Sequence, residues 1–319
     1  MAYAIKTIPE DFYVKEIINL KIEEKGSFAY CLLKKIGFPT IEAVEFISKK
    51  LNIPRKNINF AGTKDKKAVT EQAVSIRNWQ GKDFDFGKIK LEFLGYGNEP
   101  VNLGSNEGNY FEIIIRNIEK RPKERKWLIN YFDDQRFSEN NVDVGRAIVK
   151  RDFRKAAEIL RNETVINGND FIGALRIIDK KILTLYVNAY QSYLWNKCVS
   201  RIFEKQENRK IGYSLGELVI PDKKPKQSKY PLIGFGTGED DIKEILEEEK
   251  ITPREFIIRE IPELSSEGTL RNVVVEVKDL KIGDLESDEL NKGKKKIKIC
   301  FTLPKGCYAT MFLKQLFLE

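Results

Sequence analysis

The spacing of apolar residues changes twice along this chain of 319 residues, and that order restricts the folds open to it. Close or alternating apolar residues predict strands at six segments of the first half: residues 13–20, 28–33, 58–61, a run through Val74 and Ile76, 88–96 and 110–118. Helical spacing follows at residues 144–160 and 187–202, and extended segments return at 271–278 and 296–303. This order predicts an α+β chain in which an inserted domain interrupts a first domain that the C-terminus completes.

Shorter features connect the first strands. A glycine and a serine at 26–27 predict a turn that joins the first two strands as a hairpin. Residues 41–51 have the spacing of a short amphipathic helix. A glycine-led polar loop at residues 62–67 then lies between two strands, the second of which runs through Val74 and Ile76.

Three polar segments belong to the second half of the chain. Residues 221–231 are rich in proline and lysine and are predicted to form a loop. Residues 240–250 are strongly acidic and predict a helix with a solvated face, to which we assign no chemistry. Residues 286–295 are expected to connect the last two strands.

The sequence has no histidine, which excludes imidazole-based triads, histidine-ligated metals and histidine general bases. Acid or base chemistry near neutral pH must then come from Asp, Glu, Lys, Tyr or Cys, and a carboxylate is the leading candidate. The 56 Lys and Arg residues outnumber the 48 Asp and Glu residues, which gives a net charge of +8. This excess favours an anionic partner, with nucleic acid first, although many lysine-rich proteins bind no nucleic acid.

The four cysteines show no CxxC spacing and are Cys31, Cys198, Cys300 and Cys307. Neither a zinc site nor a disulfide framework is therefore expected, and each cysteine is predicted to be a small buried hydrophobe. No stretch approaches 18 apolar residues, and the N-terminus lacks a charged head followed by an apolar run. We expect a cytoplasmic protein with no membrane partner.

Asp65 is a distinctive carboxylate, because it lies among three lysines in the loop that follows Gly62. Cations beside it in the sequence favour the ionised form of the carboxylate. An ionised aspartate is what covalent or base catalysis at a sugar or pyrimidine carbon needs. The alternative interpretation is an ordinary charged surface turn.

The segment at residues 60–72 resembles the signature loop of the TruD family of tRNA pseudouridine synthases. In that family, an Ala-Gly-x-Lys-Asp core followed by Ala-Val-Thr carries the catalytic aspartate. The resemblance implies that Asp65 is this residue and that the chain isomerises a uridine of tRNA, typically uridine 13. Such a reaction needs no cofactor and no metal, which agrees with a sequence that has no P-loop and no Gly-x-Gly-x-x-Gly fingerprint.

The N-terminal segment at residues 6–16 is similar to a second motif of the family, Pro-Glu-Asp-Phe-x-Val-x-Glu. By that resemblance, Phe12 contacts the substrate and Lys6 lies near the catalytic site. Without the resemblance, Phe12 is interpreted as a core aromatic residue.

Residues 130–138 are similar to a third motif, Asn-Tyr-Phe-Gly-x-Gln-Arg-Phe-Gly. The resemblance implies that Asn130 and Phe132 hold the target nucleotide. Asp133 and Ser138 stand where the family usually has glycines, so the backbone is expected to turn differently there.

Residues 303–310 look like the closing strand and helix of the family, whereas the middle of the chain matches it only around residues 190–194. The implied fold is the pseudouridine synthase catalytic domain, with a mixed, mainly antiparallel sheet, interrupted by a TruD-specific inserted domain. We expect the catalytic domain at residues 1–140 and 268–319 and the inserted domain at 141–267.

The sequence leaves the chemical route open. Asp65 either attacks the anomeric carbon of the ribose or removes a neighbouring sugar proton. A uridine in folded RNA must be flipped out, stacked on an aromatic face and fixed by an amide, and Phe12, Phe132 and Asn130 supply those side chains. Two rivals remain: a non-catalytic RNA-binding protein, and a carboxylate-dependent glycosidase or nucleosidase. A monomer is expected.

Overall fold

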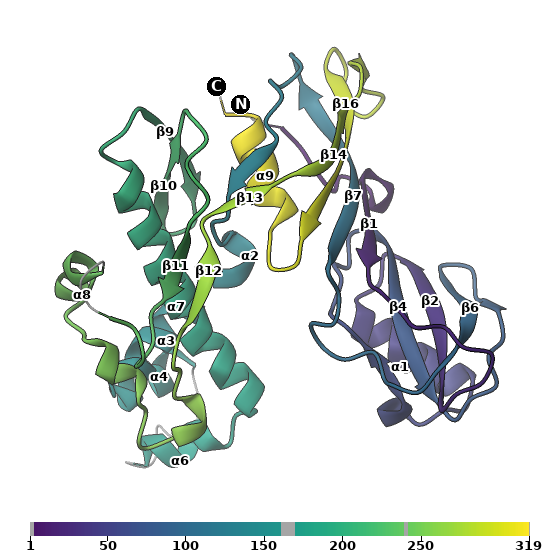
Figure 1. The fold of residues 1–319 in the computed structure, drawn as a ribbon, viewed down its shortest axis with the longest axis horizontal. Helices are drawn as coiled ribbons and strands as arrows, with labels where there is room; N and C mark the ends of the chain where they lie inside the picture. The colour runs from purple at the N-terminus through teal and green to yellow at the C-terminus, as the bar shows by residue number, and fades with distance from the viewer. Residues whose placement is uncertain (1–2, 161–169, 239–241, 319) are drawn as a thin grey trace. The chain divides into compact units, whose positions relative to one another are not determined.

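The computed structural model describes residues 3–160, 170–238 and 242–318, which form two compact units (Figure 1). The first unit spans Met1–Lys126 and Glu276–Ala309, and the second spans Trp127–Val275 and Thr310–Glu319. These two units are defined by which residues pack together. The domain limits expected at 140/141 and 267/268 come from the family resemblance instead, and they remain a prediction.

The first unit is built on a mixed sheet. Among the described residues, its strands lie in the order β14-β16-β7-β1-β4-β2-β6-β5, with β15 on β16 and β3 on β4. The strands are β1 (Phe12–Ile17), β2 (Phe28–Ile36), β3 (Ile58–Phe60), β4 (Val69–Arg77), β5 (Phe84–Asp85), β6 (Ile89–Gly97), β7 (Gly108–Ile118), β14 (Lys278–Ile282), β15 (Glu286–Ser287) and β16 (Lys295–Pro304). Of these pairs, β1 with β4 is parallel and the others are antiparallel. The predicted mixed, mainly antiparallel sheet is confirmed.

The predicted hairpin of the first two strands is wrong. β4 lies between β1 and β2, and its Val69 is the register partner of both Tyr13 and Ile36. The connection at residues 18–27 is too long to set a register as a two-residue turn would. Gly26 is needed for a close approach instead, since a Cβ there would lie 2.4 Å from the carbonyl oxygen of Gly97.

One helix covers a face of this sheet, and the prediction of that helix is confirmed. α1 (Thr40–Lys50) begins directly after Pro39. Its buried Val44 and Ile47 pack with Cys31 of β2 and Val74 of β4 in one apolar cluster. Two short 3-10 helices, η1 (Pro9–Asp11) and η2 (Arg55–Asn57), lead into β1 and β3.

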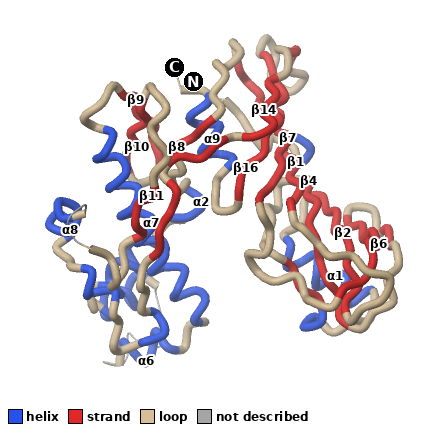
Figure 2. Tube along the Cα trace, in the orientation of Figure 1, coloured by secondary structure: helices blue, strands red, loops and turns tan. Residues whose placement is uncertain are grey.

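The second unit is largely helical, as Figure 2 shows in blue. Its described helices are α2 (Asp134–Phe137), α3 (Asn141–Val149), α4 (Phe153–Ile159), α6 (Phe171–Arg176), α7 (Lys180–Phe203), α8 (Lys243–Glu249), all but the first residue of α9 (Ala309–Leu316), and the 3-10 helices η3 (Pro253–Phe256) and η4 (Pro262–Leu264). Its strands pair two by two: β8 (Trp127–Ile129) with β13 (Val274–Glu276), β9 (Asn208–Tyr213) with β10 (Gly216–Pro221), and β11 (Lys229–Leu232) with β12 (Thr269–Asn272).

The helix predicted at residues 144–160 is two helices, α3 and α4. Arg151 has a φ of +60° between them, a conformation that ends a right-handed helix. Asp152 then caps α4, because its carboxylate accepts the Lys155 N–H at 3.0 Å. The helix predicted at residues 187–202 is present but longer, since Asp179 caps α7 before Lys180.

The strand predicted at residues 271–278 is also divided. β12, β13 and β14 each find a different partner, respectively β11, β8 and β16, so the chain must change direction between them. The loop predicted at 221–231 is narrower than expected, because Pro221 ends β10 and β11 begins at Lys229. The connection predicted at 286–295 contains β15, which pairs with the start of β16.

The acidic helix predicted at residues 240–250 is α8, with residues 240 and 241 outside the described part of the chain. Its face is not fully solvated, because Glu249 is buried and pairs with Arg146 at 3.2 Å and Lys197 at 3.1 Å. All four cysteines are free thiols. Two are buried, Cys31 and Cys198, and two are half-buried, Cys300 and Cys307. No helix within the described ranges is long and apolar enough to cross a membrane.

Candidate active site

Asp65 lies in the loop between β3 and β4 of the first unit, where 29% of its side chain is exposed. Its carboxylate forms an ion pair with the Lys6 ammonium, which comes from a segment far away in the sequence. Lys6 has a φ of +55°, a strained backbone conformation for a residue with a side chain. Lys64, although adjacent to Asp65 in the sequence, bonds with Glu16.

The N-terminal segment positions Lys6 beside Asp65. Ala4 exchanges two backbone hydrogen bonds of 2.9 Å with Arg116 near the end of β7, and η1 follows. The Lys6 ammonium also lies 4.2 Å from the centroid of the Phe12 ring, within cation–π range. Phe12 is only 3% exposed and meets the Phe111 ring edge to face at 6.2 Å. Phe12 therefore lies in the apolar core, as the interpretation without the family resemblance predicted.

Four buried side chains bond to the loop that carries Asp65, and we name them the loop cradle: Glu16 of β1, Lys35 of β2, Thr40 of α1 and Gln72 of β4. The Glu16 carboxylate pairs with the Lys64 ammonium at 2.6 Å. The Thr40 hydroxyl accepts the Lys64 N–H at 2.9 Å and donates to the Gln72 amide oxygen at 2.7 Å. The Gln72 amide nitrogen donates to the Gly62 carbonyl at 2.9 Å. Side chains rather than strand pairing thereby satisfy the Lys64 N–H and the Gly62 carbonyl of the loop.

Within the loop cradle, Lys35 bonds to Asp65 itself. Its ammonium donates to the carbonyl oxygens of Phe38 at 2.5 Å, of Asp65 at 3.1 Å and of Lys64 at 3.5 Å. The residue is 0% exposed. Burial lowers the pKa of Lys35 to about 8; the negative charge of Asp65 opposes that shift and the positive charge of Lys64 adds to it.

Asn130 and Phe132 lie in the second unit, in the segment between β8 and α2. Both are buried. Asn196 of α7 holds this segment: its side-chain oxygen accepts the Phe132 N–H at 3.0 Å, and its amide nitrogen donates to the Phe132 carbonyl at 2.9 Å. The Phe132 ring packs perpendicular to Trp195, with ring centroids 5.7 Å apart.

Arg271 of β12 joins Asn130 to Phe132. Its guanidinium donates to the backbone carbonyl of Asn130 at 2.8 Å and to the side-chain oxygen of Asn130 at 2.8 Å. The guanidinium carbon lies 3.9 Å from the centroid of the Phe132 ring. A charged plane thus covers the ring and orients the amide.

The two departures from the family's glycines are accommodated differently. Asp133 has a φ of −100°, which needs no glycine, and its carboxylate caps α2 by accepting the Asp134 N–H at 2.9 Å. Ser138 has a φ of +45°, in the region that favours glycine. Ser138 therefore adopts a conformation that glycine takes more easily, at some cost in strain, and a turn that differs from the family's remains a prediction.

The predicted site residues therefore form two groups: Lys6, Phe12 and Asp65 in the first unit, and Asn130 and Phe132 in the second. Each group is in contact within its own unit. Sequence reasoning missed three residues that hold them, namely Lys35, Asn196 and Arg271. Nothing in the sequence singles these out, because each reaches its partner only through strand or helix packing.

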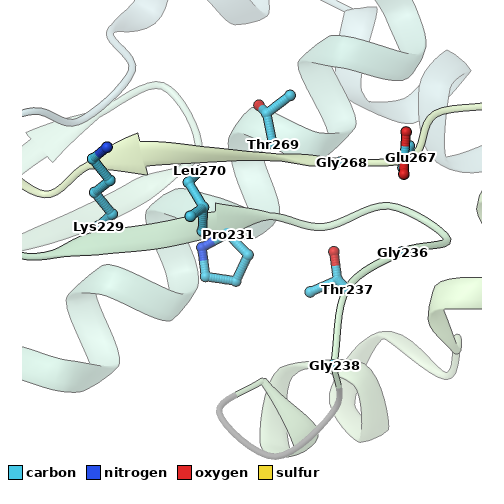
Figure 3. Close-up of a pocket in the computed structure, with 9 residues that line it drawn as sticks. All are labelled: Lys229, Pro231, Gly236, Thr237, Gly238, Glu267, Gly268, Thr269 and Leu270. Carbon is cyan, nitrogen blue, oxygen red and sulfur yellow. The ribbon is translucent and has the colours of Figure 1, made fainter.

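Two surface pockets lie apart from these groups. One, of about 480 Å³ in the second unit, lies along β11 and β12, where Pro231 and Leu270 pair across the strands (Figure 3). The other, of about 400 Å³ in the first unit, is lined by Tyr30 and Glu99 among others. None of the predicted site residues lines either pocket. Among the described residues, no group of three or more Cys, Asp or Glu side chains is placed to hold a metal ion.

Comparison with known proteins adds independent information. The family model described as tRNA pseudouridine synthase D (TruD) matches residues 1–165, 161–233 and 229–316. The chain is 31% identical to tRNA pseudouridine synthase D of Aquifex aeolicus, over 99% of this chain and 98% of that one. It is 33% identical to probable tRNA pseudouridine synthase D 2 of Methanocaldococcus jannaschii, over 97% and 90% of the two chains.

A solved structure gives the same picture for the fold. The crystal structure of the putative tRNA pseudouridine synthase D from Methanosarcina mazei superposes with a TM-score of 0.74 at 27% identity. The match covers 98% of this chain and 93% of that one. The resemblance on which the sequence analysis relied is thereby confirmed over nearly the whole chain.

Proposed function

The chain belongs to the TruD family of tRNA pseudouridine synthases, and on this premise we propose that it isomerises uridine 13 of tRNA with Asp65 as the catalytic residue. The enzyme is an isomerase. In its reaction the bond from the ribose C1′ to N1 breaks and a bond from C1′ to C5 forms, while C5 loses a proton and N1 gains one. The substrate and product have the same composition.

The observation that carries the role of Asp65 is its ion pair with Lys6 on a preorganised loop. The Lys6 ammonium lies beside the Asp65 carboxylate, and an ionised carboxylate is the form that attacks a sugar carbon or removes a sugar proton. Asp65 remains 29% exposed, so a substrate has access to it. Attack on the sugar carbon and removal of a sugar proton both use the Asp65 carboxylate in this position, so our proposal covers both routes.

The target uridine must leave its stack to meet Asp65, and we propose Phe12 as an aromatic contact for it. Phe12 is 3% exposed, and the Lys6 ammonium lies over its ring. Face-to-face stacking therefore requires Lys6 to withdraw from the ring while it keeps its ion pair with Asp65. Stacking on an aromatic ring contributes about 1–3 kcal/mol per base, which offsets much of the cost of unstacking.

In the second unit, we propose that Asn130 and Phe132 bind the target nucleotide, as the family resemblance implies. Because Arg271 covers the Phe132 ring, a base can stack on the guanidinium and extend the Phe132–Arg271 stack. Asn130 supplies an amide for the polar edge of a base. The net charge of +8 supports phosphate binding, which makes the affinity for tRNA fall with rising salt. A tRNA substrate also favours the cytoplasmic location that we expect.

Pseudouridine mapping on unmodified tRNA transcripts tests this function directly. Wild-type protein should produce one new pseudouridine, at position 13, with no free uracil or ribose. Asp65→Asn should bind the same transcript with unchanged affinity and reduce the single-turnover rate by about 10⁴-fold or more, because the amide can neither attack nor accept a proton. Release of free uracil by the wild type would indicate a nucleosidase. Binding by the wild type without any product would indicate a non-catalytic RNA-binding protein.

A further inference from the structure

Lys35 is a cation in an unusual place, fully buried under the loop that carries Asp65. Its three nearest acceptors are backbone carbonyl oxygens rather than a carboxylate: Phe38, Lys64 and Asp65. Burial of an ammonium is unfavourable unless its hydrogen bonds are satisfied, and here three backbone carbonyls accept them. Packing alone therefore does not explain why a charged hydrogen-bond donor occupies position 35.

The contacts of Lys35 converge on one backbone segment. Two of its acceptors are the carbonyls of Lys64 and Asp65, which are consecutive residues. Glu16, Thr40 and Gln72 bond to the same loop from other elements. Together these contacts fix the backbone immediately around the reacting carboxylate.

We propose that protonated Lys35 is a positioning residue for the isomerisation, which holds the backbone of Asp65 so that its carboxylate is aimed at the ribose. The proposal rests on the proposed catalytic role of Asp65. Lys35 acts through Asp65 and does not touch the substrate. Displacement of a reacting group by about 1 Å is enough to cost about 10²-fold in rate, so a clamp on the Asp65 carbonyl has direct kinetic consequences.

The surroundings of Lys35 decide how it titrates. The charged groups that face it are Asp65 and Lys64 of the loop. Glu16 of β1 acts through Lys64, whereas α1 and β4 contribute the uncharged cradle residues Thr40 and Gln72. On β6 the register partner of Lys35 is the apolar Ile89. With the pKa of Lys35 near 8, the clamp is charged at neutral pH and loses its charge in mildly alkaline solution.

Lys35→Met removes the charge and all donors but keeps an unbranched side chain only one heavy atom shorter. We expect its single-turnover rate on a tRNA transcript at pH 7 to fall by about 10- to 10²-fold, with the affinity for the transcript within about 2-fold of the wild type. Lys34→Met is the matched control: Lys34 is the neighbour on β2, half-exposed and paired with Glu71 and Glu92. The control should retain the wild-type rate.

The pH profile separates positioning from mere packing. The ratio of wild-type to Lys35→Met rates should decrease as the pH rises from 7 to 9.5, because the wild type loses the charge that the variant lacks throughout. Titration of the substrate cancels in this ratio. A wild-type rate in Lys35→Met at pH 7, or a reduced rate with a ratio that is constant over this range, would overturn the proposal.

A second variant keeps the proposal testable if Lys35→Met does not fold. Thr40→Val removes the acceptor of the Lys64 N–H while keeping the shape of the side chain, and should lower the rate by about 3- to 10-fold. An unchanged rate in Thr40→Val would also contradict the cradle as a positioning device. Failure of the proposed function is distinguishable from both results, because it requires Asp65→Asn to be active or the wild type to be inactive.

Discussion

Two segments of the molecule, one in each unit, solve the same problem in different ways. The loop around Asp65 and the segment from Asn130 to Phe132 are both irregular, and both have buried backbone groups that strand pairing does not fully satisfy. In each case side chains from other elements supply the missing hydrogen bonds. In the first unit a buried cation, Lys35, donates to the loop, whereas in the second a neutral amide, Asn196, both donates and accepts.

Of these two side chains, only Lys35 can change its charge with pH. Lys35 titrates near pH 8, so the hold on the Asp65 backbone changes in mildly alkaline solution. The same titration does not unfold the protein. Because the folded pKa of Lys35 lies below its ordinary value of 10.5, loss of the proton relieves an unfavourable buried charge, and the stability from this group rises between about pH 8 and 10.5. The Asn196 amide has no charge to lose.

A second contrast concerns the cations that cover the two aromatic rings. Lys6 lies over Phe12 and pairs with the carboxylate of Asp65. Arg271 lies over Phe132 and bonds with the amide and backbone oxygens of Asn130. We therefore expect the first cation to affect the chemical step and the second to affect RNA binding.

Among the variants that test these two contrasts, Lys6→Met should have the largest effect. Loss of the ammonium leaves the Asp65 carboxylate without its Lys6 ion pair, so the single-turnover rate should fall by about 10²- to 10³-fold, or about 3–4 kcal/mol. Transcript affinity should change by less than about 3-fold. The measurement is single-turnover kinetics at saturating enzyme, with Lys15→Met, an exposed residue of β1, as the control. An effect confined to affinity would break the contrast between the two cations.

The next effect should come from Asn196→Asp, which places a titratable group in the neutral clamp. The buried carboxylate should have a raised pKa, and when ionised it cannot donate to the Phe132 carbonyl. The folded state then binds the proton more tightly than the unfolded state, so stability falls as the pH rises. We expect a loss of about 2–4 kcal/mol at pH 8 and a smaller loss at pH 5, measured by urea unfolding.

Gln206→Glu is the control for this variant, because it makes the same chemical change at an exposed position of the same unit. It should leave the free energy of unfolding within about 0.5 kcal/mol of the wild type at both pH values. Equal losses for Asn196→Asp at pH 5 and pH 8 would show that the charge of this clamp is irrelevant to its strength.

The smallest effect should come from Arg271→Lys. Lysine keeps the charge but lacks the planar fork that reaches both oxygens of Asn130 and covers Phe132. Transcript affinity should weaken by about 10-fold, with a rate at saturating enzyme near that of the wild type. Filter binding at one fixed salt concentration measures it, with the exposed Arg154→Lys of α4 as the control. A fall in the saturated rate as large as that of Lys6→Met would remove the contrast.

Much of this architecture could be predicted from local sequence. The loop of Asp65 lies between strands as predicted, because apolar spacing marks the strands and Gly62 begins the break. The helix after Pro39 was likewise predicted from its apolar spacing and is confirmed as α1. The predicted hairpin was wrong. The glycine at position 26 allows the close approach of Gly97, and it does not mark a turn that pairs β1 with β2.

Residue order and local spacing were enough to identify the family, the first strands with the helix after Pro39, and the likeness of Asp65, Asn130 and Phe132 to the family's site residues. Only the tertiary structure decided what surrounds them. Lys6 reaches Asp65 through the pairing of Ala4 with Arg116, and Lys35 of β2 reaches the Asp65 carbonyl. In the second unit, Arg271 of β12 reaches Asn130. Such partners are far apart in the sequence, so only the folded chain brings them together, and their hydrogen bonds gain strength where the fold lowers the local dielectric constant.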